Sequence, residues 1–327
     1  QLDEHSSNVG YETRIEAAIR SFRNHHRARP PFRSGDPVLY GPSLLPAREK
    51  LLSGKTLIIP NWDSLTLNLM VANLRREGID ARLLEETGTS IQKSLRHNSG
   101  QCIPLNIIAQ EFIDYVETHH LDPAKTVLWM IESTLACNLT MFPHHIRHLL
   151  HSHGNGMSAA SVYTGGFSFM DISMRLPINA YFAYMFGGLV RKMGCRIRPY
   201  EKEKGLTDRV IKKSIDALAG SFLGKRSKES AVAEVVSWFE AIETTFTPRP
   251  KIAVFGDLYV RDNEVMNQDL VHFIEDNGGE VITTPYSSYL KMISEQYFRK
   301  WLVEGRYMSV LSSKILVTMV TMLEKTY

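Results

Sequence analysis

The sequence has few of the features that assign a protein to a class at once. Its 327 residues include three cysteines, no CxxC pair, no P-loop and no G-x-G-x-x-G fingerprint. An odd number of widely spaced cysteines does not form a disulfide framework and is typical of a reduced, cytoplasmic protein. Because the P-loop is missing, we do not expect this chain to hydrolyse ATP.

Excess charge and long apolar runs are scarce as well. A net charge of +3 gives no reason to expect a nucleic-acid or membrane partner. The most apolar late stretch, residues 315–323, is too short to span a bilayer, and the N-terminus has no apolar signal segment. We therefore predict a soluble cytoplasmic protein. Because the chain begins with Gln1 instead of methionine, we expect it to be a piece of a longer polypeptide.

Apolar strand patterns alternate with helical patterns along the chain. The segments 56–60, 81–84, 126–131, 160–163, 195–198, 251–256 and 281–283 are expected to be strands, with helices between most of them. This alternation predicts an α/β protein with mostly parallel sheets that are covered on both faces.

The predicted organisation has four parts. Residues 1–45 form an arm with one helix, and residues 46–200 form a first α/β domain that carries the cysteines. Residues 201–248 form a helical linker, which ends where Pro248 and Pro250 break the pattern. Residues 249–327 form a second, truncated α/β domain.

The three cysteines lie at the ends of predicted elements. Cys102 is followed by Ile103-Pro104 at a helix start, Cys137 follows the strand 126–131, and Cys195 precedes a short strand. A helix N-terminus stabilises negative charge, and loops at the carboxyl ends of parallel strands converge on one crevice. These positions suit an iron–sulfur cluster, which thiolates usually hold. The alternative is three buried apolar cysteines.

The role of two further groups of residues is undecided from the sequence. His144, His148 and His151 share one helix face. Two histidines one helical turn apart can bind zinc, and the alternative is that this face is polar and exposed. Asp257 and Arg261 follow the strand 251–256, at the position where open α/β sheets bind ligands. The alternative for this loop is a structural turn with an acidic helix cap.

Several short segments together resemble the large CoA-substrate-specific enzyme activases, in the region that is similar to the iron–sulfur subunits of 2-hydroxyacyl-CoA dehydratases and benzoyl-CoA reductases. The segments are residues 3–7, 98–105, 136–138, 179–188, 194–201 and 256–261.

The resemblance implies two Rossmann-like, doubly wound parallel-sheet domains with a [4Fe–4S] cluster between them. Cys102 and Cys137 match the family's cysteine segments, although Ile103 separates Cys102 from its proline, and Cys195 is the third candidate ligand. If an acyl-CoA binds, the candidate contacts are Arg196, Arg198, Asp257 and Arg261. The alternative for the arginines is ordinary ion pairing.

The function that the resemblance implies is an iron–sulfur electron-transfer or reductase-like module of an ATP-dependent 2-hydroxyacyl-CoA dehydratase or acyl-CoA reductase activation system. Its expected partners are an ATP-hydrolysing activase domain, in the same or a separate chain, an acyl-CoA dehydratase or reductase, and a second copy of the chain. Dehydratase activity is not assigned to the chain itself. The alternative is a non-catalytic scaffold that docks the ATPase domain and holds no cluster.

Overall fold

A four-stranded parallel sheet forms the centre of the protein. The structure is a computed structural model that describes residues 8–27, 52–97, 102–131, 133 and 138–325. The strands β1 (Thr56–Ile59), β2 (Asp80–Leu83), β3 (Thr126–Ile131) and β4 (Ser161–Gly165) lie in the order β2-β1-β3-β4. All four lie where the apolar runs predict them, because strands that are buried on both faces are nearly continuous in apolar residues.

The strand order contains a topological switch. The chain passes from β1 outward to β2, and then returns to place β3 on the other side of β1. In open sheets of this kind, the crevice beyond the carboxyl ends at the switch is the usual ligand site. The sheet therefore directs attention to the segments that follow β1, β2 and β3.

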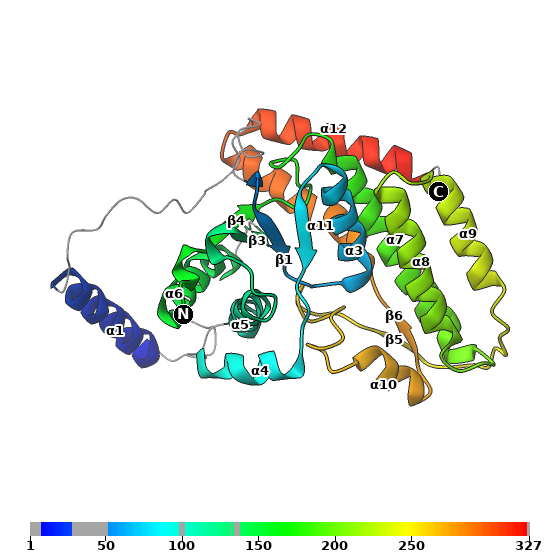
Figure 1. The fold of residues 1–327 in the computed structure, drawn as a ribbon, viewed down its shortest axis with the longest axis horizontal. Helices are drawn as coiled ribbons and strands as arrows, with labels where there is room; N and C mark the ends of the chain where they lie inside the picture. Colours follow the sequence, from blue (N-terminus) through cyan, green and yellow to red (C-terminus); the bar gives the residue numbers. More distant parts are fainter. Residues whose placement is uncertain (1–7, 28–51, 98–101, 132, 134–137, 326–327) are drawn as a thin grey trace.

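Helices cover both faces of the sheet (Figure 1). On one side lie α5 (Ile103–Thr118) and α6 (Phe142–His153), with the short helix α4 (Gly88–Ser94) packed on α5. On the other side lie α3 (Ser64–Arg76) and α7 (Leu176–Ile197). Short 3₁₀ helices complete this part of the chain: η2 (Leu95–His97), η3 (Pro123–Lys125), η4 (Asn138–Met141) and η5 (Met157–Ala159).

The segment 201–248 forms two helices that enlarge this core. α8 (Leu206–Phe222) packs against α3 and α7, and α9 (Lys228–Glu240) packs against α8. Buried apolar residues of both helices, including Leu218, Phe222 and Val235, belong to the same hydrophobic cluster as the central strands. The helices were predicted correctly, and α8 packs on the first α/β unit while α9 packs on α8.

A second, smaller parallel sheet follows. β5 (Lys251–Ala253) pairs with β6 (Glu280–Ile282), and α10 (Leu270–Asp276) connects them. Val254, Val271 and Val281 form a separate apolar cluster here. The α/β class is thus confirmed, with a four-stranded and a two-stranded parallel sheet among the described residues.

The expected strand at residues 195–198 is wrong. Cys195 and Ile197 lie in the last turn of α7, and a 3₁₀ helix, η6 (Arg198–Tyr200), continues from it. Short apolar segments fit a helix end as well as a strand, and here the helix simply runs on past Gly194.

Three further helices lie at the two ends of the chain. The N-terminal helix is α1 (Asn8–Arg27), in the predicted arm. At the other end, α11 (Tyr286–Val303) packs against α7 and leads to α12 (Tyr307–Glu324). The apolar stretch of residues 315–323, which we expected to be too short to span a bilayer, belongs to α12. This helix has 18 residues with a mean hydropathy of 1.2 and is 11% buried. By length and composition only, α12 is a candidate to cross a membrane.

Candidate functional site

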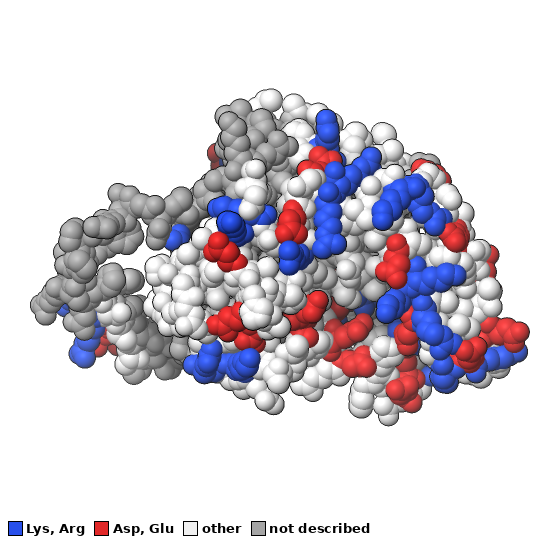
Figure 2. Space-filling view, viewed as in Figure 1, with Lys and Arg blue, Asp and Glu red and all other residues white. Residues whose placement is uncertain are grey.

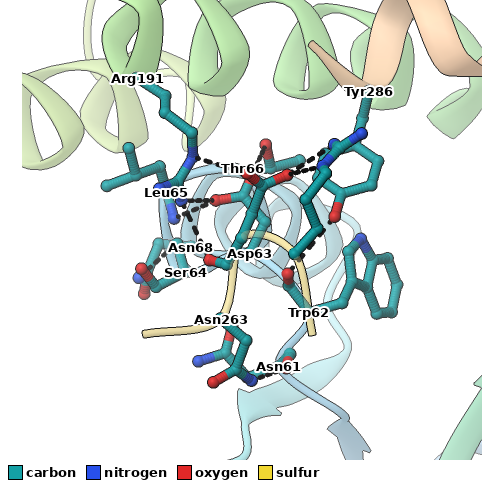
Figure 3. Close-up of polar contacts among 12 residues, drawn as sticks. Asn61, Trp62, Asp63, Ser64, Leu65, Thr66, Asn68, Arg191, Asn263 and Tyr286 are labelled. Atoms are coloured by element: carbon teal, nitrogen blue, oxygen red, sulfur yellow. Dashed lines mark hydrogen bonds and ion pairs between the residues drawn. The ribbon is translucent and has the colours of Figure 1, made fainter. Parts of the chain in front are cut away.

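The carboxyl edge of the large sheet meets the loop that follows β5. β1 leads directly into Asn61, Trp62 and Asp63, and residues 257–263 dock on this segment (Figure 3). The Asn263 side chain donates from Nδ2 to the Asn61 carbonyl oxygen at 2.7 Å. The Tyr259 ring packs edge-on against Trp62. The loop singled out in the sequence therefore lies at the switch point of the larger sheet.

A buried ion pair crosses this junction. Asp63 caps α3 by accepting from the Leu65 N–H at 3.1 Å, and Arg191 of α7 donates to the same carboxylate at 2.6 Å. Arg191 also donates to the Asp262 carbonyl oxygen at 3.3 Å. Asp63 is 1% exposed and Arg191 is 8% exposed. Charges this deeply buried are tolerated because they are paired.

Arg261 is committed to the same network. Its Nε and Nη2 both donate to Asp262, at 2.8 and 2.6 Å, and Nη2 also donates to the Thr284 carbonyl oxygen at 3.0 Å. The guanidinium lies over the Tyr286 ring, 4.7 Å from its centroid. Two arginines thus face two aspartates, so their charges cancel. Arg261 holds the loop in place and offers no spare positive charge to an acyl-CoA phosphate.

Asp257 shapes the loop. Its side chain is exposed, and Oδ1 accepts from the Tyr259 N–H at 2.9 Å. This is the side-chain-to-backbone bond of a turn in which aspartate replaces a backbone acceptor. The contact corresponds to the structural-turn alternative for this position.

Arg196 and Arg198 attach the end of α7 to the small unit. Arg198 pairs with Glu275 and Asp208, both at 2.6 Å, and Arg196 pairs with Glu280 at 2.7 Å. These carboxylates take Nη1 and Nε of Arg198 and Nη1 of Arg196, and the Arg196 side chain is 55% exposed. The structure thus gives both arginines protein partners.

A groove of about 900 Å³ runs along α3 and α8. Of the arginines chosen from the sequence, Arg198 lines it and Arg196 and Arg261 do not. The charged lining is of mixed sign: Arg75, Arg82, Glu85, Arg191, Arg198, Asp208, Lys212, Asp216, Glu264 and His272. Figure 2 likewise shows Lys and Arg interspersed with Asp and Glu on the face it presents. Neither surface is a strongly basic phosphate site.

The cysteines have unequal surroundings. Cys102 is half-buried at the N-cap of α5, whereas Cys137 lies outside the described residues. Cys195 is 2% exposed and packs among Val254, Val271 and Val281. Burial, with a contribution from the Glu275 charge, raises the pKa of the Cys195 thiol to about 11. Burial among apolar side chains is typical of a structural thiol.

The histidine face of α6 is largely open to solvent. His148 and His151 are exposed and His144 is half-buried. Within the part of the chain that the structure describes, no group of three or more His, Cys, Asp or Glu side chains is placed to hold a metal ion. This observation bears on the zinc hypothesis only for those residues.

Two glutamates with raised pKa values were not singled out from the sequence. Burial raises the pKa of Glu86, after β2, to about 8. Burial, and then the charges of Glu86 and Asp114, raise the pKa of Glu111 on α5 well above its ordinary value. Two signals could have found them. Glu86 follows a predicted strand end, and Glu111 interrupts the apolar pattern of a buried helix.

Comparison of the chain with protein-family models, with curated proteins and with solved structures gives no match.

Proposed function

We propose that the chain is an iron–sulfur electron-transfer or reductase-like module of an ATP-dependent 2-hydroxyacyl-CoA dehydratase or acyl-CoA reductase activation system. The position of Cys102 carries the proposal. It is half-buried at the N-cap of α5, the helix that connects β2 to β3. A helix between parallel strands starts near their carboxyl ends, so Cys102 lies near the edge at which β3 ends, and Cys137 follows β3 in the sequence.

The described residues fit such a cluster in part. Cys102 begins a helix with Pro104 in its first turn, and a helix N-terminus favours the negative charge of thiolates. Cys195 is enclosed by valines and fits a structural role better. The proposed ligands are therefore Cys102 and Cys137. The cluster, when bound, would supply one-electron chemistry, and the chain would position it and limit its access to water.

We further propose that β5, α10 and β6 belong to a second Rossmann-like domain. The side chains of Ile252, Phe255 and Ile282 in this unit are exposed. Apolar surface on a parallel sheet is ordinarily covered by helices or by a partner. Because the sequence has no P-loop, ATP hydrolysis is assigned to a partner activase domain.

An acyl-CoA ligand is the least supported part of this proposal. Arg198 lines the groove beside α3 and α8, so a phosphate there would have to compete with Glu275 and Asp208 for its donors. Arg196 and Arg261 are held by Glu280 and Asp262.

The cluster is tested by anaerobic purification followed by visible absorption and by iron and sulfide assays. We expect a brown protein that loses its colour and iron in Cys102→Ser and in Cys137→Ser. Cys195→Ser is the matched control and should keep the iron, because Cys195 lies in an apolar pocket. A colourless, iron-free wild type would instead support the scaffold. Metal retained in both Cys102→Ser and Cys137→Ser would point to the His144 and His148 zinc hypothesis.

A further inference from the structure

We infer that the outer face of α12 is an interface at which two copies of this chain pair antiparallel, about a two-fold axis at Ile315. This inference is independent of the proposed iron–sulfur function.

A stripe of large apolar side chains runs along α12, which lies on the outside of the molecule (Figure 1). Its members follow one another at intervals of three or four residues, so they share one face of the helix. Each is between 39% and 75% exposed. A narrow stripe with this spacing is typical of a helix that pairs with another helix. We call it the α12 seam, and it consists of Met308, Leu311, Ile315, Met319 and Met322.

The rest of the chain already holds α12 by its other face. Val310 and Val320 are buried. Glu324, in the last turn, accepts from the Tyr181 hydroxyl of α7 at 3.2 Å and pairs with Lys291 of α11. The seam is therefore presented outward by a helix that is fixed in place, which lowers the cost of binding.

The seam has the same pattern in both directions from Ile315. Leu311 and Met319 are four residues away from it, and Met308 and Met322 are seven residues away. An antiparallel pair about an axis at Ile315 therefore places Leu311 of one copy against Met319 of the other, and Met308 against Met322. A two-fold interface uses the same patch on both copies, so it requires this kind of self-complementary surface.

Charge does not oppose the pairing. The seam has no charged member, and the small polar residues Ser312 and Thr318, each three residues from Ile315, border it on its two sides. Lys314 is turned toward α11, where its Nζ lies 5.7 Å from the centroid of the Phe298 ring. Two copies therefore bring no like charges together along the centre of the seam.

The exposed area fits a weak dimer. At roughly 150–200 Å² per large side chain, the exposed parts of the seam amount to about 500 Å² on each copy and about 1,000 Å² for a pair. This is the lower limit for a specific interface. We therefore expect a dissociation constant in the micromolar range.

A lipid bilayer is the competing occupant of this face. Helices that lie in a membrane surface have a polar face rich in Lys and Arg, whereas Lys314 is the only such residue of α12. A helix that crosses a bilayer would have to give up the buried contacts of Val310 and Val320 and the hydrogen bond of Glu324. The residues of α12 thus favour a second copy.

The test is sedimentation velocity of the full chain across the micromolar range. We expect the mass to rise with concentration from that of one chain toward that of two. Ile315→Glu should weaken association at least about tenfold, because it places two carboxylates opposite each other at the axis. Val236→Glu on α9 is the matched control, since Val236 is an exposed apolar residue outside the seam and should leave association unchanged.

Cysteine cross-linking tests the direction of pairing. In the antiparallel pair the two copies of Met308 are separated by 14 residues of helix, about 21 Å, whereas Met308 and Met322 of different copies are opposite each other. A mixture of Met308→Cys and Met322→Cys should therefore form a disulfide-linked dimer on oxidation. Met308→Cys alone should not exceed the wild type, whose three cysteines set the background. This measurement decides the outcome if Ile315→Glu does not fold.

Four results would overturn the inference. They are a wild type that stays monomeric across the micromolar range, a dimer that a folded Ile315→Glu leaves intact, and cross-linking of Met308→Cys to itself in preference to Met322→Cys. The fourth is a monomer that co-sediments with phosphatidylcholine–phosphatidylserine vesicles and is released by Ile315→Glu, which would assign the seam to a membrane surface.

Discussion

His272 of α10 is held between two carboxylates. Asp208 is the main cause of the rise in the pKa of His272 to about 9, and burial opposes it while Asp269 adds to it. Arg198 lies 2.9 Å from Nε2 and also opposes protonation, but the two carboxylates outweigh it. The hydrogen bond with His272 is also the main cause that lowers the pKa of Asp208 from 3.8 to about 2.

The contribution of this pair to stability should depend on pH. Because the pKa of His272 rises from 6.5 to about 9, its contribution is complete below pH 6.5 and is lost as the pH rises through 9. The lowered pKa of Asp208 gives a contribution that is complete above 3.8 and is lost as the pH falls through 2. NMR titration of His272 should give a midpoint near 9 that falls in Asp208→Asn.

The matched control for this titration is on the same helix as Asp208. Asp216 is exposed on α8, and Asp216→Asn should leave the His272 midpoint unchanged. A wild-type midpoint at or below 6.5 would contradict the paired geometry.

At the scale of elements, the crossing of α3 and α7 depends on a glycine. A Cβ atom at Gly187 would lie 2.7 Å from the Thr66 Cα and 2.8 Å from its backbone nitrogen. On its other side, a Cβ at Gly188 would lie 2.5 Å from the Pro285 Cβ. Two adjacent glycines thus let α7 approach α3 and the start of α11 at once.

Gly187→Ala should lower the free energy of unfolding by about 1–3 kcal/mol, because backbone atoms cannot yield as a side-chain tip can. Chemical denaturation measures this loss. Gly220→Ala on α8 is the control, since a Cβ there meets nothing within 4 Å. It should be neutral, or stabilise by about 0.5–1 kcal/mol through helix propensity. Equal effects of the two substitutions would show that α3 and α7 are not in close contact at Gly187.

At the scale of the whole molecule, Arg191 joins three parts of the chain. It lies on α7 and donates to Asp63 at the start of α3 and to the Asp262 backbone in the loop after β5. Figure 3 shows the Arg191 side chain reaching Asp63 from one side, with Tyr286 on the other side. The small unit therefore depends on a buried polar network as well as on apolar contacts.

Arg191→Met should destabilise the protein by about 3–5 kcal/mol, because it leaves the buried Asp63 carboxylate without its positive partner. Denaturant unfolding measures the loss. The control is Lys202→Ala, which removes an exposed pair with Glu243 and should cost less than about 1 kcal/mol. A loss of the same small size in both variants would mean that Arg191 does not hold the units together.

Much of the fold could be predicted from short stretches of sequence. The strand at Thr126–Ile131 was predicted to the residue, because a buried parallel strand is an uninterrupted apolar run. The ends of the helix Leu176–Ile197 were not predicted to the residue, because apolar residues such as Ile197 suit a helix end and a strand equally.

Less of the candidate site could be predicted. The rule that ligands bind at the carboxyl ends of parallel strands correctly directed attention to residues 257–263, which lie at the edge of β1. It could not show that Glu280 occupies Arg196, because that pair depends on how distant elements meet, or that Arg261 turns back onto the adjacent Asp262, because that depends on the conformation of the loop. Glu86 and Glu111 were missed although the sequence holds a local signal for each, a strand end before Glu86 and an apolar helix pattern that Glu111 interrupts.

The sequence by itself determined most of the strands and helices, since local periodicity and apolar runs reflect burial directly, but not the helical end of α7 at residues 195–197. Only the tertiary structure decided which charges are paired, which thiol is enclosed by valines and which carboxyl groups are desolvated. Ion pairing and desolvation depend on neighbours far apart in the chain, and no local pattern of residues records them.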